Sequence, residues 1–263
     1  MKKYLKLYPI YVSRSIKARL SYRFDAFVGI FGFLIENALL FFTLYLTVGA
    51  IPSLNGWDVN MMGFLYGFYL IPKALDHILS DQVWQLSNGG IARGILDKYL
   101  IKPLNPLFQL VVEMIQLEGF GELILGIFFL IFFTPYVTIT WTVSNIFALI
   151  VCVIFSMLFF FATKLTFASI SFWTKRSIEV MTTIYDFSNF AKYPIQIFHQ
   201  AIRFVLTYIL PFSVVIFFPV EALLFGGNVW EQVLYVVIAS TCMIGVSLLV
   251  WSQGIKRYES AGS

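Results

Sequence analysis

The chain has 263 residues, of which 59% are hydrophobic and 12% are charged, and its formal net charge is +4. Soluble domains carry about 25% charged residues, so this composition excludes an ordinary soluble protein. Residues 37–57, 123–163 and 232–255 contain no Asp, Glu, Lys or Arg, and each is long enough for the roughly 20 residues that cross a bilayer. The positive charges follow these stretches instead of forming one patch, which disfavours nucleic acid as a partner. The sequence predicts an all-α polytopic membrane protein that forms a single transmembrane domain over residues 1–263.

Residues 1–23 predict an amphipathic helix that lies along the membrane surface. Apolar residues at spacings of three and four mark one face: Leu5, Tyr8, Val12, Ile16 and Leu20. Basic residues mark the other side: Lys3, Lys6, Arg14 and Lys17. Such a helix turns its basic face toward anionic headgroups, so membrane lipid is an expected partner.

Six membrane spans follow along the chain. They are predicted at 24–48, 59–80, 107–133, 142–168, 178–200 and 232–252, so that spans 1–2 occupy 24–80 and spans 3–4 occupy 107–168. Between the last two spans, Pro194, Pro211 and Pro219 interrupt an apolar stretch. Proline breaks helices, and irregular backbone at membrane depth requires protein or a wet cavity around it. Residues 194–225 are therefore interpreted as a re-entrant hairpin of short helices.

The positive residues also predict the orientation. With the N-terminus inside, sixteen of the eighteen Lys and Arg residues lie on the inner side, and Lys192 and Arg203 are the exceptions. Because Lys and Arg concentrate on the cytoplasmic side, both termini are expected in the cytoplasm, with residues 253–263 as a cytoplasmic tail. Lys164 is expected to snorkel at the cytoplasmic end of the fourth span.

Several polar residues fall inside the predicted spans. The third span must include Glu113, Glu118 and Glu122, because the uncharged stretch 123–133 is too short to cross the bilayer alone. Glu36 in the first span, and Asp186 with Asn189 in the fifth, are also polar residues at membrane depth. Such residues line a transport path or pack helices and subunits together, and the sequence leaves both interpretations open.

Catalytic motifs do not occur in this sequence. It contains no HExxH, GxSxG or CxxC motif and no GxxxxGK[ST] loop, and the dipeptide Gly-Lys is absent. We therefore expect no enzymatic activity, no metal site and no cofactor in this chain. If ATP drives transport, a separate subunit binds ATP and Mg²⁺.

The segment "NGGIARGILDKYLIKPLNPLF" lies between the second and third spans, on the predicted cytoplasmic side. Ile91, Ile95 and Leu96 recur at helical spacing, and Pro103 stops the helix before the next span. A short helix with apolar and charged groups suits docking on a partner. It equally suits an amphipathic helix that rests on headgroups.

Four stretches carry a resemblance to a known family. These are "GGIARGILDKYLIKPLNPLF", "SFWTKRSIEV", "AKYPIQIFHQAIRFVLTYILPFSVVIFFPVEALL" and "KRYESAGS". Together the sequence resembles the permease subunits of type-2 ATP-binding-cassette exporters, in a bacterial branch with stand-alone six-span permeases.

The resemblance implies a connecting helix over 1–23, a coupling helix over 88–105 that contacts a cytoplasmic ATPase, and a second permease, identical or paralogous. The coupling contacts implied are Gly94, Asp97, Lys98, Tyr99 and Lys102. The expected function is export of an amphipathic or lipidic compound (a drug, antimicrobial, peptide or glycolipid) across a bacterial plasma membrane. The alternative is a membrane anchor or sensor that recruits a cytoplasmic protein without transport.

Overall fold

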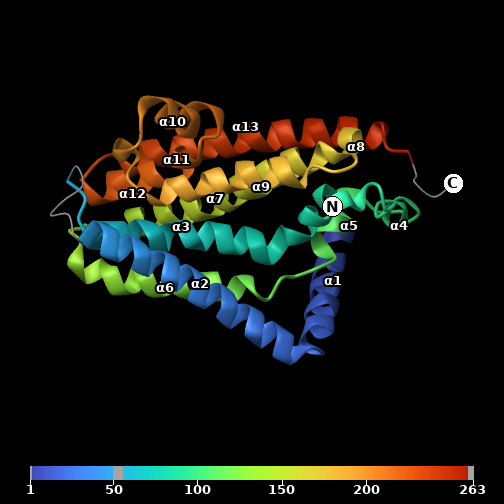
Figure 1. The fold of residues 1–263 in the computed structure, drawn as a ribbon, viewed down its shortest axis with the longest axis horizontal. Helices are drawn as coiled ribbons and strands as arrows, with labels where there is room; N and C mark the ends of the chain where they lie inside the picture. The colour runs from blue at the N-terminus through green and yellow to red at the C-terminus, as the bar shows by residue number, and fades with distance from the viewer. Residues whose placement is uncertain (1, 50–55, 260–263) are drawn as a thin grey trace.

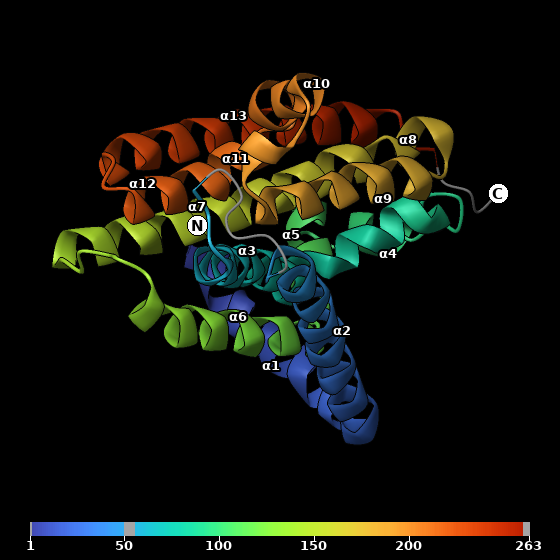
Figure 2. The same ribbon diagram turned by 60° about the vertical axis from the view of Figure 1, so that its left-hand side comes forward.

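The computed structural model describes residues 2–49 and 56–259, and within these ranges every regular element is a helix. The bundle consists of α2 (Arg23–Gly49), α3 (Val59–Ser80), α6 (Gly119–Phe133), α7 (Val143–Ser169) and α13 (Val229–Lys256). α1 (Lys2–Leu20) crosses one end of this bundle (Figure 1). α2 and α6 lie on one side of α3, and α13 lies on the opposite side (Figure 2).

Shorter elements occupy the rest of the described chain. Five of these are η1 (Asp81–Val83), η2 (Leu86–Gly90), α4 (Asp97–Leu100), α5 (Pro106–Val112) and α8 (Ser171–Thr174). The remainder are η3 (Thr134–Tyr136), α9 (Ile178–Phe187), η4 (Ser188–Lys192), η5 (Ile195–Ile197), α10 (Gln200–Phe204), η6 (Val205–Ile209), α11 (Phe212–Val215) and α12 (Phe217–Leu224). α4, α5, α8 and the C-terminal end of α13 lie at the same end of the molecule as the N-terminus (Figure 1).

Four helical stretches among the described residues are long and apolar enough to cross a membrane. They are Arg23–Thr47, Gly119–Tyr136, Val143–Thr174 and Val229–Lys256. α3 is also long enough, since its 22 residues span roughly 33 Å, but Lys73, Asp76 and His77 lower its hydropathy. The bounds of α2, α3, α7 and α13 agree with the predicted helices to within a few residues.

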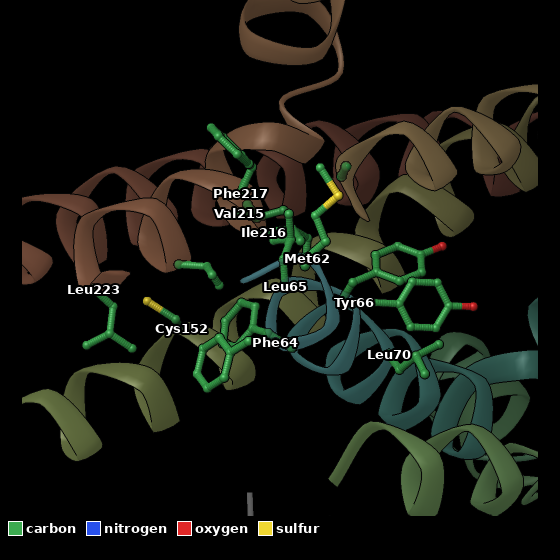
Figure 3. Close-up of a cluster of buried hydrophobic side chains, with 14 of the residues drawn as sticks. Met62, Phe64, Leu65, Tyr66, Leu70, Cys152, Val215, Ile216, Phe217 and Leu223 are labelled. Carbon is green, nitrogen blue, oxygen red and sulfur yellow. The ribbon is translucent and has the colours of Figure 1, made fainter. Parts of the chain in front are cut away.

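The main core forms where α3 packs between its neighbours. Figure 3 shows Phe64, Leu65 and Tyr66 of α3 beside Cys152 of α7 and the aliphatic side chains of α11 and α12. On the other side of α3, Gly67 faces α6, and a Cβ on Gly67 would lie 2.9 Å from the backbone nitrogen of Leu130. In a membrane, where hydrophobic exclusion between helices is weak, such close packing supplies the association energy.

The predicted third span is wrong as one continuous helix. α5 ends at Val112 and α6 begins at Gly119, so residues 113–118 interrupt it. The freed backbone groups find partners, since the Ile115 N–H donates to Ser15 Oγ at 2.7 Å and the Gln116 N–H donates to the Ile78 carbonyl at 3.1 Å. Because unwound backbone survives only where protein covers it, α1 and α3 allow this break.

The predicted fifth span, 178–200, is also wrong as one helix. α9 ends at Phe187 and continues as a 3₁₀ turn to Lys192, after which Pro194 stops it. Residues 195–224 form the series of short helices that the prolines predict. Ser156 Oγ donates to the Val215 carbonyl at 2.6 Å, which satisfies one of the backbone groups of this region.

α1 confirms the predicted N-terminal helix, but its contacts differ from the predicted stripe. Val12 and Ile16 pack against the protein, whereas Leu5 and Leu20 are exposed. Arg19, which interrupts the amphipathic pattern, turns inward and pairs with Glu118 at 3.6 Å. Helix α1 therefore binds the bundle through both apolar and polar contacts.

Candidate functional site

Six ionisable side chains meet inside the bundle. They are supplied by α3, η1, α6 and α7: Lys73, Asp76, His77, Asp81, Glu122 and Lys164, which we call the charged cluster. Helix α3 supplies three of them because residues three and four apart lie on one side of a helix. Ionisable residues on membrane helices face the bundle interior and mark functional sites by default.

Lys164 and Asp76 are the most deeply buried members of the charged cluster. The Lys164 side chain is 0% exposed, and its ammonium lies 2.9 Å from Asp76 and 3.5 Å from Asp81. Asp76 also accepts hydrogen bonds from the Tyr185 hydroxyl at 3.0 Å and from the Ser80 hydroxyl at 2.5 Å. The prediction that Lys164 snorkels to the surface is therefore wrong, because these carboxylates offer it a partner inside the protein.

Glu122 is the second centre of the charged cluster. Its carboxylate lies 3.6 Å from the Lys73 ammonium and 3.3 Å from Nδ1 of His77. The Asn37 side-chain amide donates to it from α2 at 3.4 Å. Nε2 of His77 lies 3.9 Å from Asp81. The imidazole of His77 thus connects the contacts of Glu122 with those of Asp81 and Lys164.

A cavity of about 280 Å³ opens beside these groups. Its lining combines ionisable side chains with three aromatic rings: Lys73, His77, Asp81, Glu122, Phe33, Trp84 and Tyr185. The lining comes from α2, α3, η1, α6 and α9 as well as from the residue that follows η1. The cavity therefore offers both charge and apolar contact to a ligand.

The predicted path residues divide among separate places. Glu122 belongs to the charged cluster, whereas Glu118 pairs with Arg19 of α1. Glu113 lies in the break of the third span, where its carboxylate accepts from Lys98 at 2.7 Å and from the Tyr99 hydroxyl. The structure therefore does not gather the three glutamates into one polar lining.

The other three predicted residues lie on α2, α9 and η4. Glu36 and Asp186 are exposed in the single chain, and Glu36 sits among exposed apolar residues such as Ile35 and Leu39. Asn189 is half-buried and accepts from the Tyr69 hydroxyl at 3.1 Å. The free faces of α2 and α9 thus each carry a carboxyl group.

Residues 88–105 do not form the single helix that we predict for them. The segment turns at Gly89 and Gly94, whose φ angles of 72° and 67° lie in the left-handed region that favours glycine. One helical turn follows as α4, Asp97–Leu100. Two left-handed residues so close together prevent a continuous helix.

The same segment has a buried side and an exposed side. Ile91, Leu96 and Tyr99 are buried against α7 and α8. The exposed side includes Lys98, Leu100, Ile101 and Lys102, which we call the coupling surface, and Arg93 before it is exposed as well. Ile101 is 82% exposed, so this surface presents an apolar group beside positive charges.

The five predicted coupling contacts therefore differ in placement. Lys98 and Lys102 are exposed, whereas Tyr99 points inward, and burial with the Glu113 hydrogen bond raises its pKa above the ordinary range. The Asp97 carboxylate accepts from the Tyr258 hydroxyl at 2.8 Å, and burial together with this bond raises the pKa of Tyr258 to about 12. Gly94 shapes the turn. Leu100 and Ile101 are exposed beside these lysines but are not among the five predicted contacts.

The members of the charged cluster on α3 and η1 were also missed. Lys73, Asp76, His77 and Asp81 follow one another at spacings of three, one and four, in and just after a stretch predicted to span the membrane. That periodic polar stripe was the signal available in the sequence. Among residues 2–49 and 56–259, no three His, Cys, Asp or Glu side chains are arranged to hold a metal ion.

Comparison with known families found one match, and it covers most of the chain. The model of the family described as "ABC-2 family transporter protein" matches residues 34–262. No curated protein and no solved structure matched the chain. The matched region includes the charged cluster, the coupling surface and all four apolar membrane-crossing stretches except the first turns of α2. The chain therefore belongs to the ABC-2 family transporter proteins, as a transmembrane permease component and not as the ATPase.

Proposed function

We propose that this chain is the permease subunit of an ATP-driven exporter and forms half of a path for an amphipathic or lipidic compound. A cytoplasmic ATPase would bind ATP and Mg²⁺ and dock on the coupling surface. A second permease, identical or paralogous, would complete the path in a bacterial plasma membrane. Drugs, antimicrobials, peptides and glycolipids are candidate substrates.

One observation carries the proposal: contacts link the coupling surface to the charged cluster. Lys98 pairs with Glu113 at 2.7 Å, and Glu113 begins the unwound segment 113–118. In that segment the Gln116 side-chain amide donates to Asp81 at 3.4 Å. A partner that pulls on the coupling surface would therefore move groups that contact the inner cavity.

The membrane topology of the proposal has six crossings. Besides the four apolar stretches, α3 and the α9–η4 pair would supply the second and fifth. The ten residues of α9 and the five of η4 extend roughly 25 Å. The buried short helices α11 and α12 support a re-entrant hairpin, since they pack into the core beside α3 and α7.

The second permease would cover the free faces of α2 and α9. Glu36 lies at the middle of α2, and an exposed carboxyl there would otherwise meet lipid at a cost of several kcal/mol. Asp186 of α9 has the same exposure. A partner or an aqueous path beside these helices removes that cost. The cavity lined by α2, α3 and α9 would then open toward the path between the subunits.

The test is a charge placed on the coupling surface, Ile101→Asp, in the permease purified together with the ATPase that it is proposed to bind. Burial of a new carboxylate in the docking interface should weaken association at least about tenfold, equivalent to 1.4 kcal/mol. The matched control is Val143→Asp, which places the same charge away from the coupling surface. Val143 is 85% exposed and lies at the start of α7, at the opposite end of the bundle.

Unchanged association and unchanged ATP-dependent export by Ile101→Asp would contradict the docking proposal. Normal association without any ATP-dependent export by the native complex would favour the anchor or sensor function instead. Equal loss for both variants would indicate a folding defect, which size-exclusion chromatography of each variant detects.

A further inference from the structure

The charged cluster has an unequal number of opposite charges. Three carboxylates, Asp76, Asp81 and Glu122, face two ammonium groups, Lys73 and Lys164. With a neutral His77 the cluster carries one net negative charge, and with an imidazolium its net charge is zero. An unbalanced charge inside a membrane protein is costly. The cluster therefore requires one more positive charge than its lysines supply.

The net charge of the cluster can change through protonation of His77. The His77 ring lies between Glu122 of α6 at 3.3 Å and Asp81 of η1 at 3.9 Å. The cations near it are Lys73 on α3 and Lys164 on α7, and Tyr185 of α9 lines the same cavity. From α2 it meets the uncharged ring of Phe33, with ring centroids 4.8 Å apart. Imidazole is the one side-chain type in the cluster whose charge ordinarily changes between pH 5 and 8, so His77 is the member that gains or loses a proton beside the cavity.

The cavity also suits a cation other than a proton. Its volume of about 280 Å³ equals roughly nine water molecules at 30 Å³ each, which accommodates an ammonium head group but not a whole amphiphile. Phe33, Trp84 and Tyr185 provide aromatic surfaces, which attract cations through their ring faces. Glu122 and Asp81 provide the opposite charge.

We infer that this cavity binds the monocationic head group of the transported amphiphile, and that the bound cation replaces the proton on His77. This inference rests on the proposed transport function, for which it names the substrate class. As the cation enters, the His77 imidazolium releases its proton to water and becomes neutral imidazole. The net charge of cluster and ligand together stays at zero. An anionic head group would instead leave the cluster with an uncompensated charge.

The experiment measures binding to the purified permease in non-ionic detergent, without the ATPase. The probes are a pyrene-labelled dodecyl trimethylammonium and the same pyrene-labelled chain ending in a carboxylate. The ammonium probe should bind more tightly at pH 8 than at pH 5.5, by up to about tenfold per pH unit, the limit for displacement of one proton. The carboxylate probe should bind at least about tenfold more weakly at pH 8.

Two variants separate the cavity from unspecific uptake of probe. Glu122→Gln removes the extra negative charge and should weaken binding of the ammonium probe at least tenfold. His77→Gln removes the competing proton, so binding should persist and lose its pH dependence. Glu231→Gln, exposed near the start of α13, is the control that should behave like the native chain.

Equal binding of both probes, pH-independent binding by the native chain, or retained pH dependence in His77→Gln would overturn the inference. His77→Gln keeps the test decisive if Glu122→Gln fails to fold. Because the ATPase is absent, cation binding that follows these expectations would stand even if ATP-driven export were not found. Export of a neutral or anionic compound without cation binding would instead leave the proposed function standing and refute this site.

Discussion

Replacement of Lys164 by Met is the sharpest test of the buried ion pairs. Lys164 and Asp76 are both 0% exposed and their charged atoms lie 2.9 Å apart. Removal of one partner leaves a buried charge uncompensated, which costs about 3–5 kcal/mol. For a chain of 150–250 residues each kcal/mol lowers Tm by about 2–4 °C, so Lys164→Met should lower Tm by about 6–20 °C.

In the assay, the protein is heated in detergent at one fixed rate, and the fraction of protein that remains monodisperse is measured at each temperature. The matched control is Lys98→Met, which removes the 2.7 Å ion pair between Lys98 and Glu113. Because the Lys98 side chain is 44% exposed, this substitution should change the free energy of unfolding by under about 1 kcal/mol. Asp76→Asn added to Lys164→Met should recover at least half of the loss. A Lys164→Met protein that unfolds within about 2 °C of the native chain would refute the buried pair and support a snorkelling lysine.

Two further predictions concern helix packing and coupling. Gly121→Ala should destabilise the protein by about 1–3 kcal/mol, because the added Cβ would lie 2.1 Å from the Ile30 carbonyl oxygen where α2 crosses α6. The control Gly32→Ala should not destabilise the protein, because a Cβ there meets nothing within 4 Å. Equal Tm values for the two variants would contradict this helix packing. Glu113→Gln should leave ATPase association intact and lower ATP-dependent export severalfold, because it removes the Lys98 ion pair that connects the coupling surface to the unwound segment. Unchanged export at native ATPase stoichiometry would contradict that connection.

The long helices could be predicted because each depends on its own residues. α2, α7 and α13 are apolar runs with clear ends, and Thr142 and Asn228 cap the last two through side-chain acceptors. The third and fifth spans could not be predicted as they are. The break in the third span depends on partners elsewhere in the chain, such as Ser15 of α1 for the backbone of Ile115. The end of the fifth span at Pro194 is a local signal, but the change from α9 to the 3₁₀ turn η4 before it is not marked by a proline or glycine.

The candidate site was predictable only in part. Glu122 could be identified because a carboxyl in an apolar helix is costly without partners. Its partners could not, since Lys73 and His77 lie on another helix and become neighbours only through helix packing. That residues 88–105 bind an ATPase stays a prediction. Which side chains of this segment are exposed could not be predicted, because Tyr99 is buried by packing against other elements whereas Ile101 is left exposed.

The sequence by itself determined that this chain resides in a membrane, and where the long helices α2, α3, α7 and α13 begin and end to within a few residues. It also indicates that residues 88–105 can meet a partner, which stays a prediction. Those properties follow from hydropathy, charge and capping, which act along the chain over one or two helical turns. Only the tertiary structure decided which charges pair, because Lys164 finds Asp76 through the packing of α7 against α3 and not through any local signal. That packing turns scattered polar residues into a charged cluster with a cavity beside it.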